Sequence, residues 1–278
     1  MSRFYNSPAA LCVAFATVLP VNAVAQIVPN APPNDEGWNL RLDFGLMATP
    51  KYRGDNDYQI SALPGVRLSY GDTFFASVNE GIGFNLIRSG PWRAGPIMRY
   101  DFGRDEDGDS IFRISGDRTD DLKGLGDVDG TVELGGFIEY DLGQFKTYLE
   151  VRQGLGGHEG IVGRAKVDYK TVFRSFGPPA FFSIGPIITF ASSDYTSAYF
   201  DVNAAQSAAS GLTVYDAGGG LTSYGINAAL TMPITDRAAI TAIAGWDVLT
   251  GDVADSSLVR ERGSRNQGRF GVFTGFRF

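Results

Sequence analysis

The sequence is poor in the side chains on which many enzymes and secreted folds depend. It has one cysteine, Cys12, and one histidine, His158, in 278 residues. A single cysteine excludes a framework of disulfide bonds within the chain, and a single histidine argues against zinc sites and histidine-based catalysis. Lys and Arg number 24 against 31 Asp and Glu, so the basic excess that neutralises nucleic-acid phosphates is missing and we expect no nucleic-acid partner.

Long apolar runs are also missing. After residue 25 no stretch has 18 consecutive apolar residues, which excludes helical membrane spans. The first 25 residues carry Arg3, an apolar run at 9–19 and the small residues of 23–25, and this order predicts a secretory signal peptide cleaved after Ala25. A retained N-terminal anchor is the alternative. The proline-containing residues 26–36 are predicted to form a flexible lead-in to the mature chain.

Hydrophobic residues are plentiful, at 44% of the chain, and they alternate with polar ones. In the first such segment every second residue is apolar: Trp38, Leu40, Leu42, Phe44 and Leu46. The same period of two returns at 60–70, 92–102, 132–142, 145–153, 161–173, 224–232 and 269–278. A period of two predicts strands with one apolar and one polar face.

The connections between these segments alternate in length. Tight ones at 71–72, 89–91, 143–144, 177–179 and 234–236 alternate with long polar ones at 48–57, 104–129, 192–221 and 251–267. Short turns on one side and long loops on the other are typical of outer-membrane barrels, with the turns in the periplasm and the loops outside the cell. The 36 glycines suit the tight turns and the bending of crowded strands.

The number of strands follows from parity. A signal peptide places the N-terminus in the periplasm, and the chain ends on a strand whose Phe276 and Phe278 read as a barrel-assembly signal, so the strand count is even. Splitting the segment 73–86 near Asn79-Glu80-Gly81 makes the count even and places every long loop outside the cell. We therefore predict an all-β fold in which residues 37–278 form a single domain, a transmembrane antiparallel outer-membrane β-barrel of about 12 strands, with 10 as the alternative.

Aromatic residues near the strand ends are predicted to form the girdle that meets the membrane interface. They are Trp38, Tyr70, Trp92, Tyr100, Tyr140 and Tyr148.

Charges of both signs occupy the polar faces of the strands. The residues predicted to line the lumen are Arg41, Asp43, Arg67, Arg93, Arg99, Asp101, Glu133, Glu139, Lys146, Glu150, Arg152, Arg164, Lys166 and Asp168. Such groups either pair into a lattice that fills the lumen or line a narrow polar pore.

His158 lies in Gly156-Gly157-His158-Glu159-Gly160, which is predicted to be a short outer connection. Membrane-barrel hydrolases place a histidine at the outer rim, so a hydrolytic role is one hypothesis. The sequence has no recognisable serine motif beside it, and a turn residue is the favoured interpretation. We predict no catalytic residue, no metal site and no cofactor.

Four segments resemble the MipA/OmpV family of outer-membrane proteins, in the family's order and over nearly the whole mature chain. The first runs from Ser192 to Val202 and continues through Gln206–Gly211 to Tyr215. The second is Leu249–Val259, and the third is the set Pro50, Tyr52, Gly54, Pro64, Tyr70, Phe74 and Phe75. The fourth is Gly124–Val128, which leads to Glu133. Asp201 departs from the family pattern, which has glycine there.

The resemblance implies an outer-membrane barrel without catalytic residues. The family's namesake is similar to a scaffold that brings a murein transglycosylase and a penicillin-binding protein together. Tyr195, Tyr199, Phe200 and Tyr215 are then candidates for a partner surface, or alternatively for a lid packed over the barrel mouth.

We therefore predict a non-enzymatic structural or scaffolding protein of the Gram-negative outer membrane, in contact with membrane lipid and lipopolysaccharide. A narrow diffusion channel for small polar solutes is the first alternative, and a surface hydrolase using His158 is the second.

Overall fold

The computed structural model describes residues 37–110, 112–174 and 178–278. The predicted signal peptide and lead-in lie outside the described residues. Among the described residues no helix is long and apolar enough to cross a membrane.

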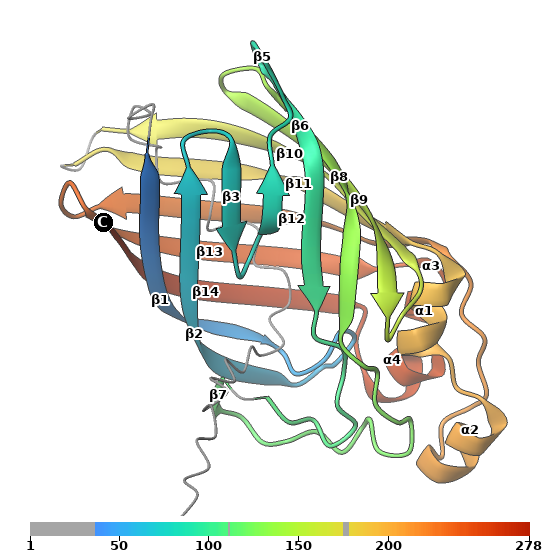
Figure 1. Cartoon of the computed structure of the whole chain (residues 1–278). Coiled ribbons are helices and arrows are strands. Elements are labelled where there is room, and N and C mark those ends of the chain that lie inside the picture. Colours follow the sequence, from blue (N-terminus) through green and yellow to red (C-terminus); the bar gives the residue numbers. More distant parts are fainter. Residues whose placement is uncertain (1–36, 111, 175–177) are drawn as a thin grey trace, which may run out of the picture.

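Twelve antiparallel strands close into a barrel (Figure 1). They are β1 (Trp38–Pro50), β2 (Tyr58–Tyr70), β3 (Phe74–Ser77), β4 (Gly81–Phe84), β6 (Trp92–Asp101), β8 (Thr131–Asp141), β9 (Phe145–Gly156), β10 (Ile161–Phe173), β11 (Ala180–Ala191), β12 (Gly220–Pro233), β13 (Ala238–Leu249) and β14 (Asn266–Arg277). The first and last strands pair from Arg41 with Arg277 to Ala48 with Phe270, which closes the barrel. The prediction of a barrel of about 12 strands is confirmed.

The segment after Gly71 does split into two strands. β3 and β4 pair with each other and flank residues 78–80, as the parity of the strand count predicts. Because both strands are short, two small elements complete the wall around them. β5 (Ile87–Ser89) pairs with β6 beyond the end of β4, and β7 (Arg113–Ser115) pairs with β2 where β3 does not reach it.

The alternating sequence becomes an apolar exterior and a mostly polar interior. Along β1 the exposed side chains are Trp38, Leu40, Leu42, Phe44 and Leu46, while the residues between them face inward. Near the turns, Trp38 packs on Tyr70 with ring centroids 5.2 Å apart, and Trp92 packs on Tyr140 at 4.2 Å. An apolar outer surface with aromatic pairs at its edge is the form a barrel takes in lipid.

The assignment of Tyr148 to the aromatic girdle is wrong. On β9 it shares a face with Lys146 and Glu150, and its hydroxyl donates to Glu150 Oε2 at 2.5 Å. Its position near a strand end suggested an interfacial ring, but the period of two turns its side chain into the lumen.

Two strands, β11 and β13, fall outside the alternating segments of the sequence. Most of their inward residues are apolar or small, including Ile187 on β11 and Ala239 and Ile243 on β13, with Asp247 on β13 as an exception, so the two faces differ little in polarity. On β13, Ile243 belongs to an apolar cluster inside the barrel, together with Met47, Leu63, Ala229 and Phe273. A strand that is apolar on both faces gives no period-two signal.

The long connections gather at one end of the barrel, which we call the loop end, together with the short connection 157–160 between β9 and β10. Most of the tight turns lie at the opposite end, the turn end (Figure 1). Four short helices form within two of the loops: α1 (Ser193–Phe200), α2 (Ala204–Ser210), α3 (Gly251–Asp255) and α4 (Ser257–Arg262). With eight residues or fewer, these helices have no helical period that the sequence analysis detects.

The loops pack into a folded layer at the loop end, which we call the loop cap and define as four segments, residues 51–57, 102–110 together with 112–130, 192–219, and 250–265. One apolar cluster joins all four segments through Tyr52, Leu122, Leu125, Val202, Leu212 and Leu258. A second contains Phe200, Ala217, Leu249, Val253, Ala254 and Val259. Arg262 also donates to the Asp121 carbonyl at 2.7 Å. The cap is therefore held by its own buried apolar side chains.

Candidate functional site

The barrel encloses a cavity of about 950 Å³ that extends along most of the lumen. Its walls include Arg104 of the loop cap and Gly143 of a tight turn at the opposite end. Both charged and apolar side chains line it, so it differs from the apolar exterior of the same strands.

Most of the charges predicted to line the lumen border this cavity. They are Arg93, Arg99, Asp101, Glu133, Lys146, Arg152, Arg164, Lys166 and Asp168. Glu139 and Glu150 lie behind that lining, buried in the wall, where Glu139 forms an ion pair with Lys146 at 2.7 Å.

Arg41, Asp43 and Arg67 lie apart from the main cavity and line a small pocket between β1 and β2. Arg41 pairs with Asp43 at 2.6 Å, and Arg67 forms an ion pair with Glu80 from the connection between β3 and β4. The charges are therefore divided between the wall of the main cavity and this small pocket.

The most deeply buried charges meet around Glu150, which is fully buried. Its carboxylate pairs with Arg99 at 2.8 Å, accepts from the Tyr148 hydroxyl and forms a further ion pair with Arg152. Because β6, β8, β9 and β10 are neighbours in the sheet, their inward charges face one another over a short distance. A buried carboxylate is stable only with such partners.

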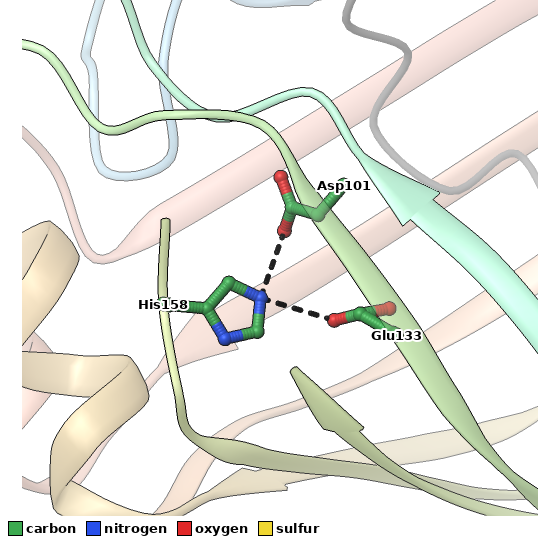
Figure 2. Close-up of side chains that lie close together, drawn as sticks. All are labelled: Asp101, Glu133 and His158. Atoms are coloured by element: carbon green, nitrogen blue, oxygen red, sulfur yellow. Dashed lines mark ion pairs between the residues drawn. The ribbon is translucent and has the colours of Figure 1, made fainter. Parts of the chain in front are cut away.

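His158 lies in the tight connection 157–160, and its side chain is buried under the loop cap. The imidazole Nε2 atom is 3.3 Å from Glu133 Oε1 and 3.8 Å from Asp101 Oδ2 (Figure 2). The chain therefore brings together a histidine at a strand connection and two carboxylates that the sequence analysis assigned only to the lumen.

The four aromatic residues of the 192–215 loop lie within the loop cap. Phe200 is buried, and the rings of Tyr195 and Tyr199 have centroids 4.9 Å apart. The Tyr199 hydroxyl donates to Asp101 Oδ1 at 2.9 Å, and burial together with the Asp101 carboxylate raises the pKa of Tyr199, which keeps the hydroxyl protonated as a donor. Tyr215 packs against both apolar clusters and donates to the Asp252 carbonyl.

Two polar groups of the lumen are not among the residues predicted from the sequence. Arg269 on β14 donates to Asp247 on β13 and to Asn227 on β12. Arg53 of the loop cap donates to Thr222 Oγ1 at 2.9 Å. Arg269 follows from alternation, because it lies next to the outward Phe270, whereas the inward reach of Arg53 from a loop follows from no local pattern.

The chain ends on β14 with both terminal aromatic rings exposed. Phe276 pairs with Leu42, and the amide of Phe278 donates to the Leu40 carbonyl at 2.9 Å. Their role as an assembly signal stays a prediction.

Several solved outer-membrane barrels are similar to the chain in outline. A loop-deletion mutant of OmpT from Vibrio cholerae is 8% identical, with 87% of this chain and 98% of that chain covered and a TM-score of 0.35. OmpF of Salmonella typhi, in complex with daunomycin, is 9% identical over 88% and 98% of the two chains, with a TM-score of 0.38. At these TM-scores the fold assignment rests on the strand pairing of this chain itself.

Curated proteins include no match to this chain. The model of one protein family, described as MltA-interacting protein MipA, matches residues 42–278, which include nearly the whole barrel and the loop cap. The match agrees with the resemblance carried by the four sequence segments, three of which lie largely in the loop cap. The chain therefore belongs to the MipA family.

Proposed function

We propose that this protein is a non-enzymatic platform of the Gram-negative outer membrane that brings murein-processing enzymes together. The observation that carries the proposal is the family match over residues 42–278, because the family is described by an interaction with MltA. A murein transglycosylase is accordingly the first partner to test, and a penicillin-binding protein is the second.

Placement in the outer membrane is supported by the surface of the barrel. Leu42, Phe44, Val66, Ile138 and Val272 are exposed on the outward faces of the strands, where water would solvate them poorly. In the proposed orientation the turn end faces the periplasm, and the loop cap lies among the lipopolysaccharide head groups.

The location of murein constrains where its enzymes dock. Murein lies in the periplasm, so the enzymes contact the turn end, whereas Tyr195, Tyr199, Phe200 and Tyr215 belong to the opposite end. The hairpin of β5 and β6 is a suitable surface, because Leu86 and Ile87 are 68% and 56% exposed at the turn end. In Figure 1 this hairpin projects beyond the neighbouring strand ends.

Site-specific photocrosslinking in cells tests this proposal. A photoreactive amino acid at Arg88, exposed on β5, is expected to crosslink a murein transglycosylase. The same group at Thr213, exposed in the loop cap, is the matched control and is expected to crosslink no periplasmic protein. Recovery of no murein enzyme from Arg88, or equal recovery from both positions, would contradict the proposal.

A narrow diffusion channel is the second candidate, because the cavity is lined from Arg104 at the loop end to Gly143 at the turn end. Reconstitution in planar bilayers distinguishes the two functions. A channel gives discrete conductance steps. Their ion selectivity is expected to change in Arg93→Gln, because Arg93 is part of the cavity wall. It is expected to stay the same in Arg265→Gln, because Arg265 is exposed in the loop cap. Absence of steps excludes the channel.

A surface hydrolase using His158 has the weakest support. Among the described residues, the ion-pair and ring contacts of the imidazole are with two carboxylates and two tyrosines. Equal hydrolysis of lipid and peptide substrates by the wild type and His158→Ala is the expected result.

A further inference from the structure

Three potential metal-ligand atoms converge at the loop end of the lumen. His158 Nε2 lies 3.3 Å from Glu133 Oε1 and 3.8 Å from Asp101 Oδ2, and one ligand atom from each of the three residues lies within 4.8 Å of the other two (Figure 2). The residues come from β6, β8 and the connection between β9 and β10, so the closed sheet brings them together.

The other oxygen of each carboxylate is already held by the protein. Asp101 Oδ1 accepts from the Gly103 amide and from the Tyr199 hydroxyl, each at 2.9 Å. Glu133 Oε2 accepts from Arg152 Nε at 2.7 Å. These bonds fix the orientation of both carboxylates and leave Oδ2 and Oε1 directed at the imidazole. Hydrogen bonds of this kind commonly orient the ligands of protein metal sites.

The imidazole supplies an independent observation. The His158 side chain is fully buried, and neither of its ring nitrogens makes a hydrogen bond within the described part of the chain. Its backbone amide donates to Thr131 Oγ1 at 2.9 Å, and the Tyr195 ring packs against it edge-on at 4.9 Å, so its position is fixed. A buried polar atom without a hydrogen bond destabilises the folded protein. A cation bound at Nε2 would remove this cost for that nitrogen.

We propose that Asp101, Glu133 and His158 bind one divalent first-row transition-metal ion. One imidazole and two carboxylates suit Zn²⁺ or Mn²⁺, whereas Ca²⁺ and Mg²⁺ prefer oxygen ligands alone. Zinc binds histidine nitrogen and carboxylate oxygen at about 2.0–2.2 Å, and the observed 3.3 and 3.8 Å separations suit neighbouring ligands of one ion at such distances. Asp101 and Glu133 also line the main cavity, which provides a path of entry.

Metal titration of the whole barrel tests the proposal. The protein is purified in detergent without a polyhistidine tag, stripped with a chelator and titrated with Zn²⁺ in a calorimeter. One ion per chain is expected for the wild type. His158→Ala and Glu133→Gln are expected to weaken binding at least tenfold, because each removes one of three protein ligands.

Glu139→Gln is the matched control. Glu139 lies on the same strand and the same face as Glu133 and is also buried, but its partner is Lys146. It is expected to bind Zn²⁺ like the wild type. Retention of wild-type affinity by both His158→Ala and Glu133→Gln, or an equal loss in Glu139→Gln, would overturn the site.

A Co²⁺ spectrum of the wild type gives a decision that does not depend on folding of the variants. Coordination by the site is expected to shift the visible absorption of Co²⁺ from that of the aqueous ion, and Zn²⁺ is expected to reverse the shift. If the wild type binds no Zn²⁺ and leaves the Co²⁺ spectrum unchanged, the three residues form a structural ion-pair cluster only and the proposal is wrong.

Discussion

The ring of Phe190 on β11 lies over Gly163, the residue with which it pairs on β10. The Phe190 Cζ atom is 2.0 Å from the position that a Cβ atom on residue 163 would occupy. Any larger side chain at 163 therefore collides with the ring. The glycine is needed here because an aromatic side chain from the next strand fills the space above its backbone.

The same arrangement occurs at two other cross-strand pairs. Phe75 on β3 covers Gly83 on β4, with 2.2 Å to the ideal Cβ position, and Phe273 on β14 covers Gly45 on β1, with 2.4 Å. Part of the glycine excess is thus explained by aromatic rings on the inner wall, which leave no room for a side chain on the residue they cover. Turns account for other glycines. Aromatic rings over glycine also help to fix the register of neighbouring strands.

Gly163→Ala is expected to destabilise the barrel by about 1–3 kcal/mol, because the Phe190 ring must move within a packed interior. Urea unfolding in detergent measures the change in the free energy of unfolding. Gly136→Ala is the control, since the nearest atom to its ideal Cβ is 3.6 Å away. Combining Gly163→Ala with Phe190→Ala should remove most of the clash. A purely additive double variant would count against this account.

Glu150→Gln is expected to cost about 3–5 kcal/mol, because it leaves the buried Arg99 and Arg152 guanidinium groups without their shared carboxylate. Asp255→Asn provides the comparison. It breaks the Arg265 ion pair, whose side chains are more than half exposed, and should cost about 0–1 kcal/mol. Chemical unfolding of both variants tests the difference, and equal losses would contradict it.

Thr231 and Thr241 form a buried hydroxyl pair across β12 and β13, with their Oγ1 atoms 3.0 Å apart. Thr231→Val should cost about 1–2 kcal/mol, because the remaining hydroxyl loses this partner. The double change to valine should cost less than the sum of the single changes, since it removes both polar groups. A double-mutant cycle on unfolding free energies measures the coupling, and a coupling near zero would refute the pairing.

Asp55 makes the stability of the loop cap depend on pH. Burial, together with the nearby Asp121 carboxylate, raises the pKa of Asp55 from 3.8 to about 6. The folded protein therefore holds the Asp55 proton more tightly than the unfolded chain does. The stability linked to this proton is fully present below about pH 4 and is lost as the pH rises through about 6.

Asp55→Asn should abolish this part of the pH dependence. Melting temperatures of both proteins, measured between pH 3.5 and 7.5, are compared as a difference, which cancels the contributions of other groups. The wild type should lose stability relative to the variant between about pH 4 and 6 and then level off. Parallel curves over this range would show that Asp55 does not carry the effect.

The class of fold and the inward or outward direction of most strand side chains follow from the sequence. Alternation at segments such as Trp38 to Leu46 assigns apolar and polar faces, because side chains in a strand point to opposite sides in turn. Unequal connections and an even strand count then give twelve strands, including the division near Glu80. Inward charges on β6, β8, β9 and β10 follow from the same alternation.

Features that depend on neighbours across the sheet follow from the closed barrel and not from the local sequence. Most residues on both faces of β11 and β13 are apolar or small, and the place of these strands in the wall follows from pairing with β10, β12 and β14. The rings over glycine depend on strand register, and the packing of the loop cap depends on four segments far apart in the chain.

The cluster of Asp101, Glu133 and His158 depends on barrel closure in the same way. Alternation directs the two carboxylates inward, but it gives no direction to a histidine in a connection between strands. Its burial follows because the cap folds over that connection, with Tyr195 against the imidazole. The sequence thus determines which way a strand residue faces, and the closed barrel determines which residues meet.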